Sequence, residues 1–132
     1  MVGAPYEDDA TTASVGKAYV HRTSNGELLY TLSNPALPST YGYRVAASNT
    51  HAVISPTITY DASGQAVGAA CLYRLSDGTL TRTIVNPNPH SIPALEAFGD
   101  SISMDSDNIV IGVPGSSTPT ITGTGVVYIF RP

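Results

Sequence analysis

Charged residues in general, and lysine in particular, are scarce in this sequence. Acidic and basic residues make up 12 % of the 132 residues, which is about half of their usual share in globular domains. Six basic residues against ten acidic ones give a net charge of −4, and Lys17 is the one lysine. Such a chain cannot neutralise a run of phosphates, so we expect no nucleic-acid partner.

Cysteine and long apolar runs are also missing. Cys71 stands alone and cannot form a disulfide within the chain, so no oxidising compartment is indicated. There is no apolar run of about 18 residues, and we expect no insertion into a membrane. The hydrophobic fraction of 42 % is still enough for a core. The length predicts one modest domain or a piece of a larger one.

Short sequence features recur in a fixed order. An aromatic–glycine dipeptide occurs as Tyr41-Gly42 and, 57 residues later, as Phe98-Gly99. Apolar segments that end in proline occur three times, at 2–5, 53–56 and 111–114. Glycine followed by a mostly apolar run also occurs three times, at 16–20, 68–72 and 125–129. Several features in one order indicate a structural repeat.

Each repeat also contains a hairpin signal. Asn25-Gly26 and, 52 residues later, Asp77-Gly78 are each followed by a segment rich in apolar residues, which favours a tight turn between two strands. Prolines soon after each of these segments prevent the strand from continuing. Five extra residues around 91–96 account for the difference between the two spacings.

The complete repeat predicts four short strands, at 43–48, 51–55, 69–75 and 80–85. No helical period extends beyond a turn or two, so we expect an all-β chain. The third strand of a repeat is apolar on both faces, as in 126–130, which predicts a sheet buried on both sides. Antiparallel four-stranded sheets stacked face to face are the blades of a β-propeller. A two-sheet sandwich is the alternative.

About 2.5 blades are expected, which makes an incomplete propeller. Residues 1–40 form a partial blade with strands two to four, 41–97 a complete blade, and 98–132 a partial blade with strands one to three. Propellers close with roughly four to eight blades, so the first and last sheets should each present an apolar face and an unpaired edge. We therefore expect a protein partner or self-association to complete the open blades.

These features resemble the FG-GAP repeat of integrin-α-type and bacterial surface β-propellers. Phe98-Gly99 matches the first half of that name and Val2-Gly3-Ala4-Pro5 the second. The resemblance implies a propeller blade and a role in ligand binding or adhesion outside the cytoplasm. Many family members hold calcium in an Asp-x-Asp-x-Asp-Gly loop between the first two strands. Short turns at 48–50 and 105–108 replace that loop here, so the resemblance carries over no calcium site.

Acidic residues in two loops are the candidate metal ligands. Glu7, Asp8 and Asp9 follow the first GAP-like segment, and Asp105 and Asp107 lie in a turn. Calcium needs six to eight oxygen ligands, and Asp residues also favour turns through bonds to their own backbone. No cofactor is expected unless one of these loops binds Ca²⁺; the alternative is a solvated loop.

Loop residues are also the candidates for ligand binding. Tyr6, Tyr60 and His90 lie between expected strands, where propellers usually meet their ligands. Tyrosine suits such a surface because one end of its side chain is apolar and the other polar. The alternative is that the tyrosine rings cover blade edges and that His90 is a solvated surface residue.

No nucleophile, base and orienting group can be named together, so we expect no enzyme. The favoured function is a non-catalytic structural or interaction module in an adhesin or in an extracellular, cell-surface or virion-surface assembly. A calcium-dependent carbohydrate-binding module is the alternative, with a glycan as partner. An accessory propeller domain of an enzyme is less favoured.

Overall fold

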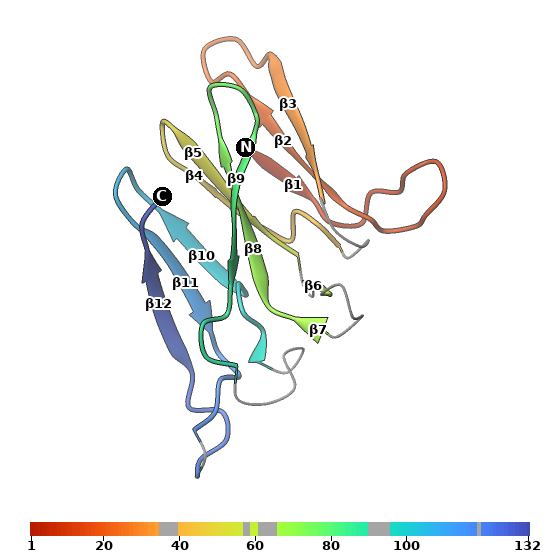
Figure 1. The fold of residues 1–132 in the computed structure, drawn as a ribbon. Coiled ribbons are helices and arrows are strands. Elements are labelled where there is room, and N and C mark those ends of the chain that lie inside the picture. Colours follow the sequence, from red (N-terminus) through yellow and green to blue (C-terminus); the bar gives the residue numbers. More distant parts are fainter. Residues whose placement is uncertain (35–39, 57–58, 61–65, 90–95, 119) are drawn as a thin grey trace.

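All regular elements in the described part of the chain are β-strands, which confirms the all-β prediction. A computed structural model of the protein describes residues 1–34, 40–56, 59–60, 66–89, 96–118 and 120–132. Its strands form three antiparallel sheets of three, four and three strands and one short two-stranded sheet (Figure 1). No helix among these residues has the length and apolar character needed to cross a membrane.

The N-terminal sheet has the strand order β1-β2-β3. These strands are β1 (Val2–Ala4), β2 (Lys17–His21) and β3 (Leu28–Ser33). The turn between β2 and β3 is closed by the Gly26 amide, which donates to the carbonyl oxygen of Arg22 at 2.9 Å. This is the hairpin that Asn25-Gly26 predicts.

The middle sheet contains four strands in the order β4-β5-β8-β9. Their bounds are β4 (Arg44–Ala47), β5 (His51–Ser55), β8 (Ala69–Arg74) and β9 (Leu80–Val85). The segment between β5 and β8, expected to be a plain loop, contains two further short strands. β6 (Thr59–Tyr60) and β7 (Ala66–Val67) pair with each other in an antiparallel hairpin.

The C-terminal sheet has the order β10-β11-β12. Its strands are β10 (Ser101–Met104), β11 (Ile109–Val113) and β12 (Val126–Phe130). In Figure 1 this sheet lies on the opposite side of the middle sheet from β1, β2 and β3. The chain therefore passes through three neighbouring sheets in sequence order.

Two hydrophobic cores hold the sheets together. One core joins the N-terminal and middle sheets, and its buried residues are Ala18, Val20, Leu32, Tyr41, Ile54, Cys71 and Tyr73. The other joins the middle and C-terminal sheets, and its buried residues are Val53, Ala70, Leu72, Ile84, Phe98, Ile109, Ile111 and Val113. Alternate residues of β8 enter different cores, so the middle sheet is buried on both faces, as its apolar third strand predicts.

Candidate functional site

Positions 57 residues apart occupy the same place in the middle and C-terminal sheets. Val53, Ala70 and Leu72 point from the middle sheet into its core with the C-terminal sheet. Their counterparts on the C-terminal sheet point away from that core. Ala70 and Leu72 are 0 % and 2 % exposed, respectively. The repeat thus identifies a face that is covered in one sheet and uncovered in the next.

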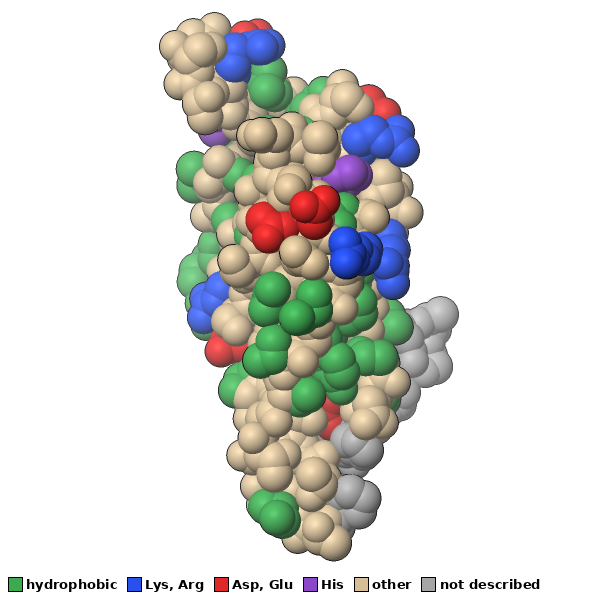
Figure 2. Space-filling view, turned by 90° about the vertical axis from the view of Figure 1, so that its left-hand side faces the viewer, with side chains coloured by type: hydrophobic (Ala, Val, Ile, Leu, Met, Phe, Trp, Pro, Cys, Tyr) green, Lys and Arg blue, Asp and Glu red, His purple; other side chains and the backbone are tan. Residues whose placement is uncertain are grey.

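The outer face of the C-terminal sheet is apolar and exposed over β11 and β12. Val110 pairs with Ile129, and Gly112 pairs with Val127, so these residues lie side by side on one face. Val127 is 61 % exposed and Ile129 is 69 % exposed. Figure 2 shows the side of the molecule that carries this sheet, where hydrophobic side chains gather in the middle. We call Val110, Val127 and Ile129 the outer apolar face.

Beside this face, the outer edge of β12 has no neighbouring strand among the strands that the structure describes. β12 stands at the end of the order β10-β11-β12, whereas its counterpart β8 is followed by β9. Unpaired N–H and C=O groups on an edge strand can pair with a strand from another chain. The outer apolar face and this edge therefore lie on the same sheet.

The opposite end of the molecule is polar. Tyr19 pairs with Val2 and Thr31, and Lys17 pairs with Ala4 and Ser33, on the face of the N-terminal sheet that points away from the core. The Glu7 carboxylate joins two of these side chains: the Lys17 ammonium donates to one oxygen at 2.6 Å and the Tyr19 hydroxyl to the other at 2.5 Å. This face therefore combines a bonded polar cluster with the exposed side chain of Val2, where the sequence leads us to expect an apolar face.

The same contacts change the protonation behaviour of the three side chains. The hydrogen bonds from Lys17 and then Tyr19 hold the pKa of Glu7 below its usual value. The hydrogen bond to Glu7 raises the pKa of Lys17 and also that of Tyr19. Glu7 is therefore a charged loop residue bound to the sheet, and each of its two carboxylate oxygens already accepts a hydrogen bond.

The other candidate metal ligands bind the backbone of their own loops. Oδ1 of Asp9 accepts from the amides of Thr11 and Thr12, each at 2.7 Å. Oδ1 of Asp8 accepts from the Ser14 amide at 2.8 Å. The hydrogen bonds from Thr11 and Thr12 hold the pKa of Asp9 below its usual value. These carboxylates stabilise the loop between β1 and β2.

The turn between β10 and β11 is built in the same manner. Oδ1 of Asp105 accepts from the amides of Asp107 and Asn108, each at 2.7 Å, and these bonds lower the pKa of Asp105. The Asp107 carboxylate accepts from the neighbouring Ser106 hydroxyl at 3.2 Å. Within the described ranges, no three His, Cys, Asp or Glu side chains converge in a way that could hold a metal ion.

The three candidate ligand-binding residues are not brought together as a described site. Tyr6 lies in the turn after β1 and is 67 % exposed. Tyr60 belongs to β6, but its side chain lies outside what the structure describes. His90 lies outside the described residues.

Each aromatic–glycine dipeptide packs into the neighbouring sheet. Tyr41 forms a bridge with Gly16, and a side chain at Gly3 would overlap the carbonyl oxygen of Gly42. The dipeptide thus lies between the end of β1 and the start of β2. Gly42 has φ +88°, a left-handed conformation that favours glycine.

Phe98-Gly99 makes the equivalent contact one sheet further along. A side chain at Gly68 would overlap the Phe98 side chain, and one at Gly99, with φ +85°, would overlap the Ser55 hydroxyl. This dipeptide therefore lies between the end of β5 and the start of β8. The recurring glycines serve to bring a segment of the next repeat against the ends of two strands.

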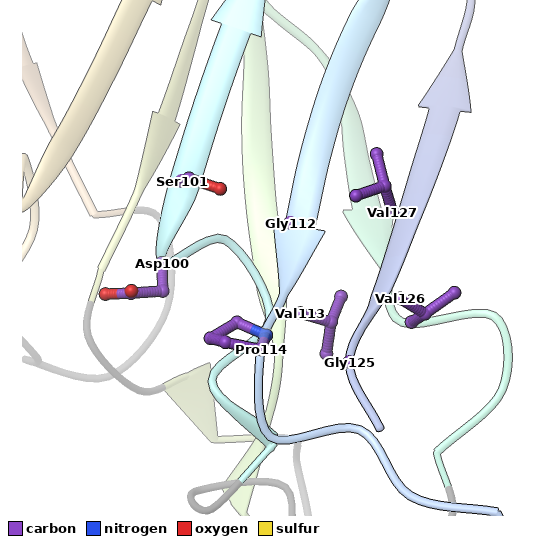
Figure 3. Close-up of a pocket in the computed structure, with 8 residues that line it drawn as sticks. All are labelled: Asp100, Ser101, Gly112, Val113, Pro114, Gly125, Val126 and Val127. Carbon is purple, nitrogen blue, oxygen red and sulfur yellow. The ribbon is translucent and has the colours of Figure 1, made fainter. Parts of the chain in front are cut away.

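At the corresponding place on the C-terminal sheet the structure has an open cleft. Its volume is about 480 Å³, and it lies at the starts of β10 and β12 and the end of β11 (Figure 3). The residues that line it are Asp100, Ser101, Gly112, Val113, Pro114, Gly125, Val126 and Val127. Gly112 and Gly125 are the counterparts of Ser55 and Gly68, 57 residues earlier.

Two features of this region escaped the sequence analysis. The cleft is one, although the repeat itself gives the positions of Gly112 and Gly125. The other is Glu96, which is fully buried and accepts a hydrogen bond from the Asn86 amide group at 2.6 Å. Nothing near Glu96 in the sequence signals its burial.

Comparison of the chain with models of known protein families, and with curated proteins, finds no match.

Proposed function

We propose that this chain is a non-catalytic structural module, a segment of an FG-GAP-like β-propeller, and that it joins another β-sheet through its C-terminal sheet. The observation that carries the proposal is the exposure of Val127 and Ile129, at positions where Ala70 and Leu72 form part of a core. Burying an apolar side chain of this size stabilises an assembly by about 1.5–3 kcal/mol. A further sheet stacked here would bury the outer apolar face.

Sheet organisation supports the propeller part of the proposal. Sheets of three, four and three antiparallel strands follow one another along the chain and stack through two cores. Equivalent residues of the repeat occupy equivalent places in both cores. A sandwich would instead leave the outer faces of both of its sheets polar.

Composition and the FG-GAP resemblance support a place for the module in an extracellular, cell-surface or virion-surface assembly. Polarity comes mainly from Ser and Thr, and 12 % of the residues are charged. A calcium-dependent carbohydrate-binding module has less support, because Glu7, Asp9 and Asp105 already accept hydrogen bonds from protein groups.

Light scattering coupled to size-exclusion chromatography tests the proposed association. We expect the wild-type chain to have a mass above that of a monomer and to increase in mass with concentration. Ile129→Lys should give a monomer, because a charge on the outer apolar face cannot be buried without a partner. Val2→Lys is the matched control, since Val2 is 57 % exposed on the polar end. A wild-type chain that stays a soluble monomer at every concentration, and that also binds no separate β-strand segment at this face, would contradict the proposal.

A further inference from the structure

The repeat provides three places that can receive an aromatic–glycine dipeptide, but the sequence has only two such dipeptides. Tyr41-Gly42 occupies the place between β1 and β2, and Phe98-Gly99 occupies the place between β5 and β8. The third place, between β11 and β12, is the open cleft. The sequence has no other aromatic residue directly followed by glycine.

We infer that this cleft receives an aromatic–glycine dipeptide that opens the first β-strand of a further repeat of the same kind. The inference rests on the proposed function and adds the chemistry of the partner. The occupant is a backbone turn with glycine in a left-handed conformation, preceded by a Phe or Tyr ring and followed by a strand.

Close backbone approach is the first requirement, and the cleft meets it. At the two filled places, Gly3 and Gly16 or Gly68 have no side chain, so the dipeptide contacts the receiving strands directly. A methyl group added at Gly125 would have its nearest neighbour at 3.5 Å, which is the carbonyl oxygen of Pro114. As far as the described residues go, space is therefore left beside Gly125, whereas Gly16 and Gly68 are each in contact with an aromatic residue.

An apolar surface for the ring is the second requirement. Phe98 packs in a core whose members include Val53, Ala70 and Leu72. The counterparts of these three residues are Val110, Val127 and Ile129, which form the outer apolar face beside the cleft. A ring entering the cleft would find the same three positions filled by equally apolar side chains.

A polar contact accompanies the second filled place. Arg44, the first residue of β4, donates from Nε to the carbonyl oxygen of Asp100 at 2.5 Å, directly after Phe98-Gly99. The counterpart of Arg44 is Ser101, which lines the cleft and is exposed. A hydroxyl at this position can donate to the same backbone oxygen of an incoming segment.

A second copy of the chain is the weaker candidate for the occupant. Both of its dipeptides lie in their own receiving places, so offering one to the cleft would require it to open a core. Its other end is polar, with Glu7, Lys17 and Tyr19 bonded to one another. A further repeat whose dipeptide is free can enter the cleft without opening a core.

A peptide with the sequence of residues 98–105 is the probe, added to the isotopically labelled full chain and followed by NMR. We expect saturable shifts of the Gly112, Gly125 and Val127 amides. A control peptide with the changes Phe98→Ser and Gly99→Val should bind about tenfold more weakly or worse. Gly112→Val in the full chain should weaken binding of the original peptide to a similar extent, because the added valine side chain occupies part of the cleft. Unchanged signals elsewhere in the spectrum show that this variant is folded.

Three results would overturn the inference. One is the absence of shifts at these amides. Another is equal binding of both peptides, which would indicate an unspecific apolar surface. The third is a shift of the cleft amide signals when the concentration of the chain alone is raised, with no further shift when the peptide is added. That result would identify a second copy as the occupant. If light scattering shows association while the peptide fails to bind, this inference is wrong and the proposed function stands; a monomer that binds no peptide removes both.

Discussion

The Tyr41 hydroxyl donates a hydrogen bond to the Tyr73 hydroxyl at 2.7 Å in the core between the N-terminal and middle sheets. The Tyr73 hydroxyl in turn donates to the carbonyl oxygen of Ser33 at 3.2 Å. In the next core the counterparts are Phe98 and Phe130, which meet edge to face with ring centroids 6.4 Å apart. The repeat therefore places two aromatic residues at the same positions in each core, as a hydrogen-bonded tyrosine pair in one and as an apolar phenylalanine pair in the other.

Removing the Tyr41 hydroxyl should destabilise the protein modestly. Tyr41→Phe deletes one buried hydrogen bond, which is worth about 1 kcal/mol, and Tyr73 keeps Ser33 as an acceptor. The reverse change, Phe98→Tyr, places a hydroxyl in an apolar core and should cost about 1–3 kcal/mol unless a partner is found. Urea unfolding of both variants measures the two effects. If Phe98→Tyr destabilised the protein less than Tyr41→Phe does, the core around Phe98 would not be the less polar of the two.

The two buried tyrosines also predict a loss of stability in alkali. Burial raises the pKa of Tyr73 to about 12 and that of Tyr41 beyond the usual range. The folded state therefore holds its protons while the unfolded state releases them from about pH 10, so stability falls as the pH rises above that value. Tyr41→Phe should lose less stability than the wild type across this range. Thermal unfolding at a series of alkaline pH values, with ultraviolet absorbance of ionised tyrosine, tests this; parallel curves for the two proteins would contradict it.

Glu7 predicts a loss of stability in acid. Hydrogen bonds from Lys17 and then Tyr19 lower the pKa of Glu7 from 4.5 in the folded state. The stability that Glu7 contributes is therefore fully present above pH 4.5 and is lost as the pH falls through the lower pKa of the folded state. Glu7→Gln should melt below the wild type near neutral pH, and the two melting temperatures should converge in acid. Tyr19→Phe, which removes one of the two donors, should fall between them. A gap of constant size at every pH would show that Glu7 acts only through packing.

Glycine in β1 should be less replaceable than the corresponding glycine in β11. A methyl group at Gly3 would overlap the backbone oxygen of Gly42, which cannot move without shifting a strand, so Gly3→Ala should cost about 1–3 kcal/mol. At Gly112 the methyl group would meet the Ser101 hydroxyl, which can rotate. Gly112→Ala should lie within about 1 kcal/mol of wild type. Chemical denaturation compares them, and equal costs would argue against the packing of Gly42 on Gly3.

Calcium should have no effect on thermal unfolding. The carboxylates of Glu7, Asp9 and Asp105 accept hydrogen bonds from neighbouring protein donors, and binding an ion would break these bonds. Melting curves with added calcium and with a chelator should therefore coincide. A lower melting temperature in the chelator would revive the calcium-dependent carbohydrate-binding alternative, and binding of a glycan would then be the next measurement.

The strand positions could be predicted because turn signals and apolar segments recur in one order. Residues 51–55 and 80–85 are predicted as strands and form β5 and β9 with the same bounds. The hairpin of β6 and β7 could not be predicted, because it occurs in one loop of the repeat and has no second copy to compare.

The polar end of the molecule was missed for a different reason. Tyr19 occupies an apolar position in the repeat, and its hydroxyl becomes important only through Glu7, twelve residues earlier and across a loop. Loop conformation decides whether these groups meet, and spacing along the chain does not reveal it. For the same reason the sequence groups Glu7 with Asp8 and Asp9, whereas in space the three carboxylates have different partners.

The two outward faces of the described sheets differ in chemistry. Val127 and Ile129 suit a partner with an apolar face, whereas Glu7, Lys17 and Tyr19 suit a partner that offers polar groups. Copies stacked head to tail would press the charged Glu7 and Lys17 pair against apolar side chains, which is costly, so a fibre of identical units is disfavoured.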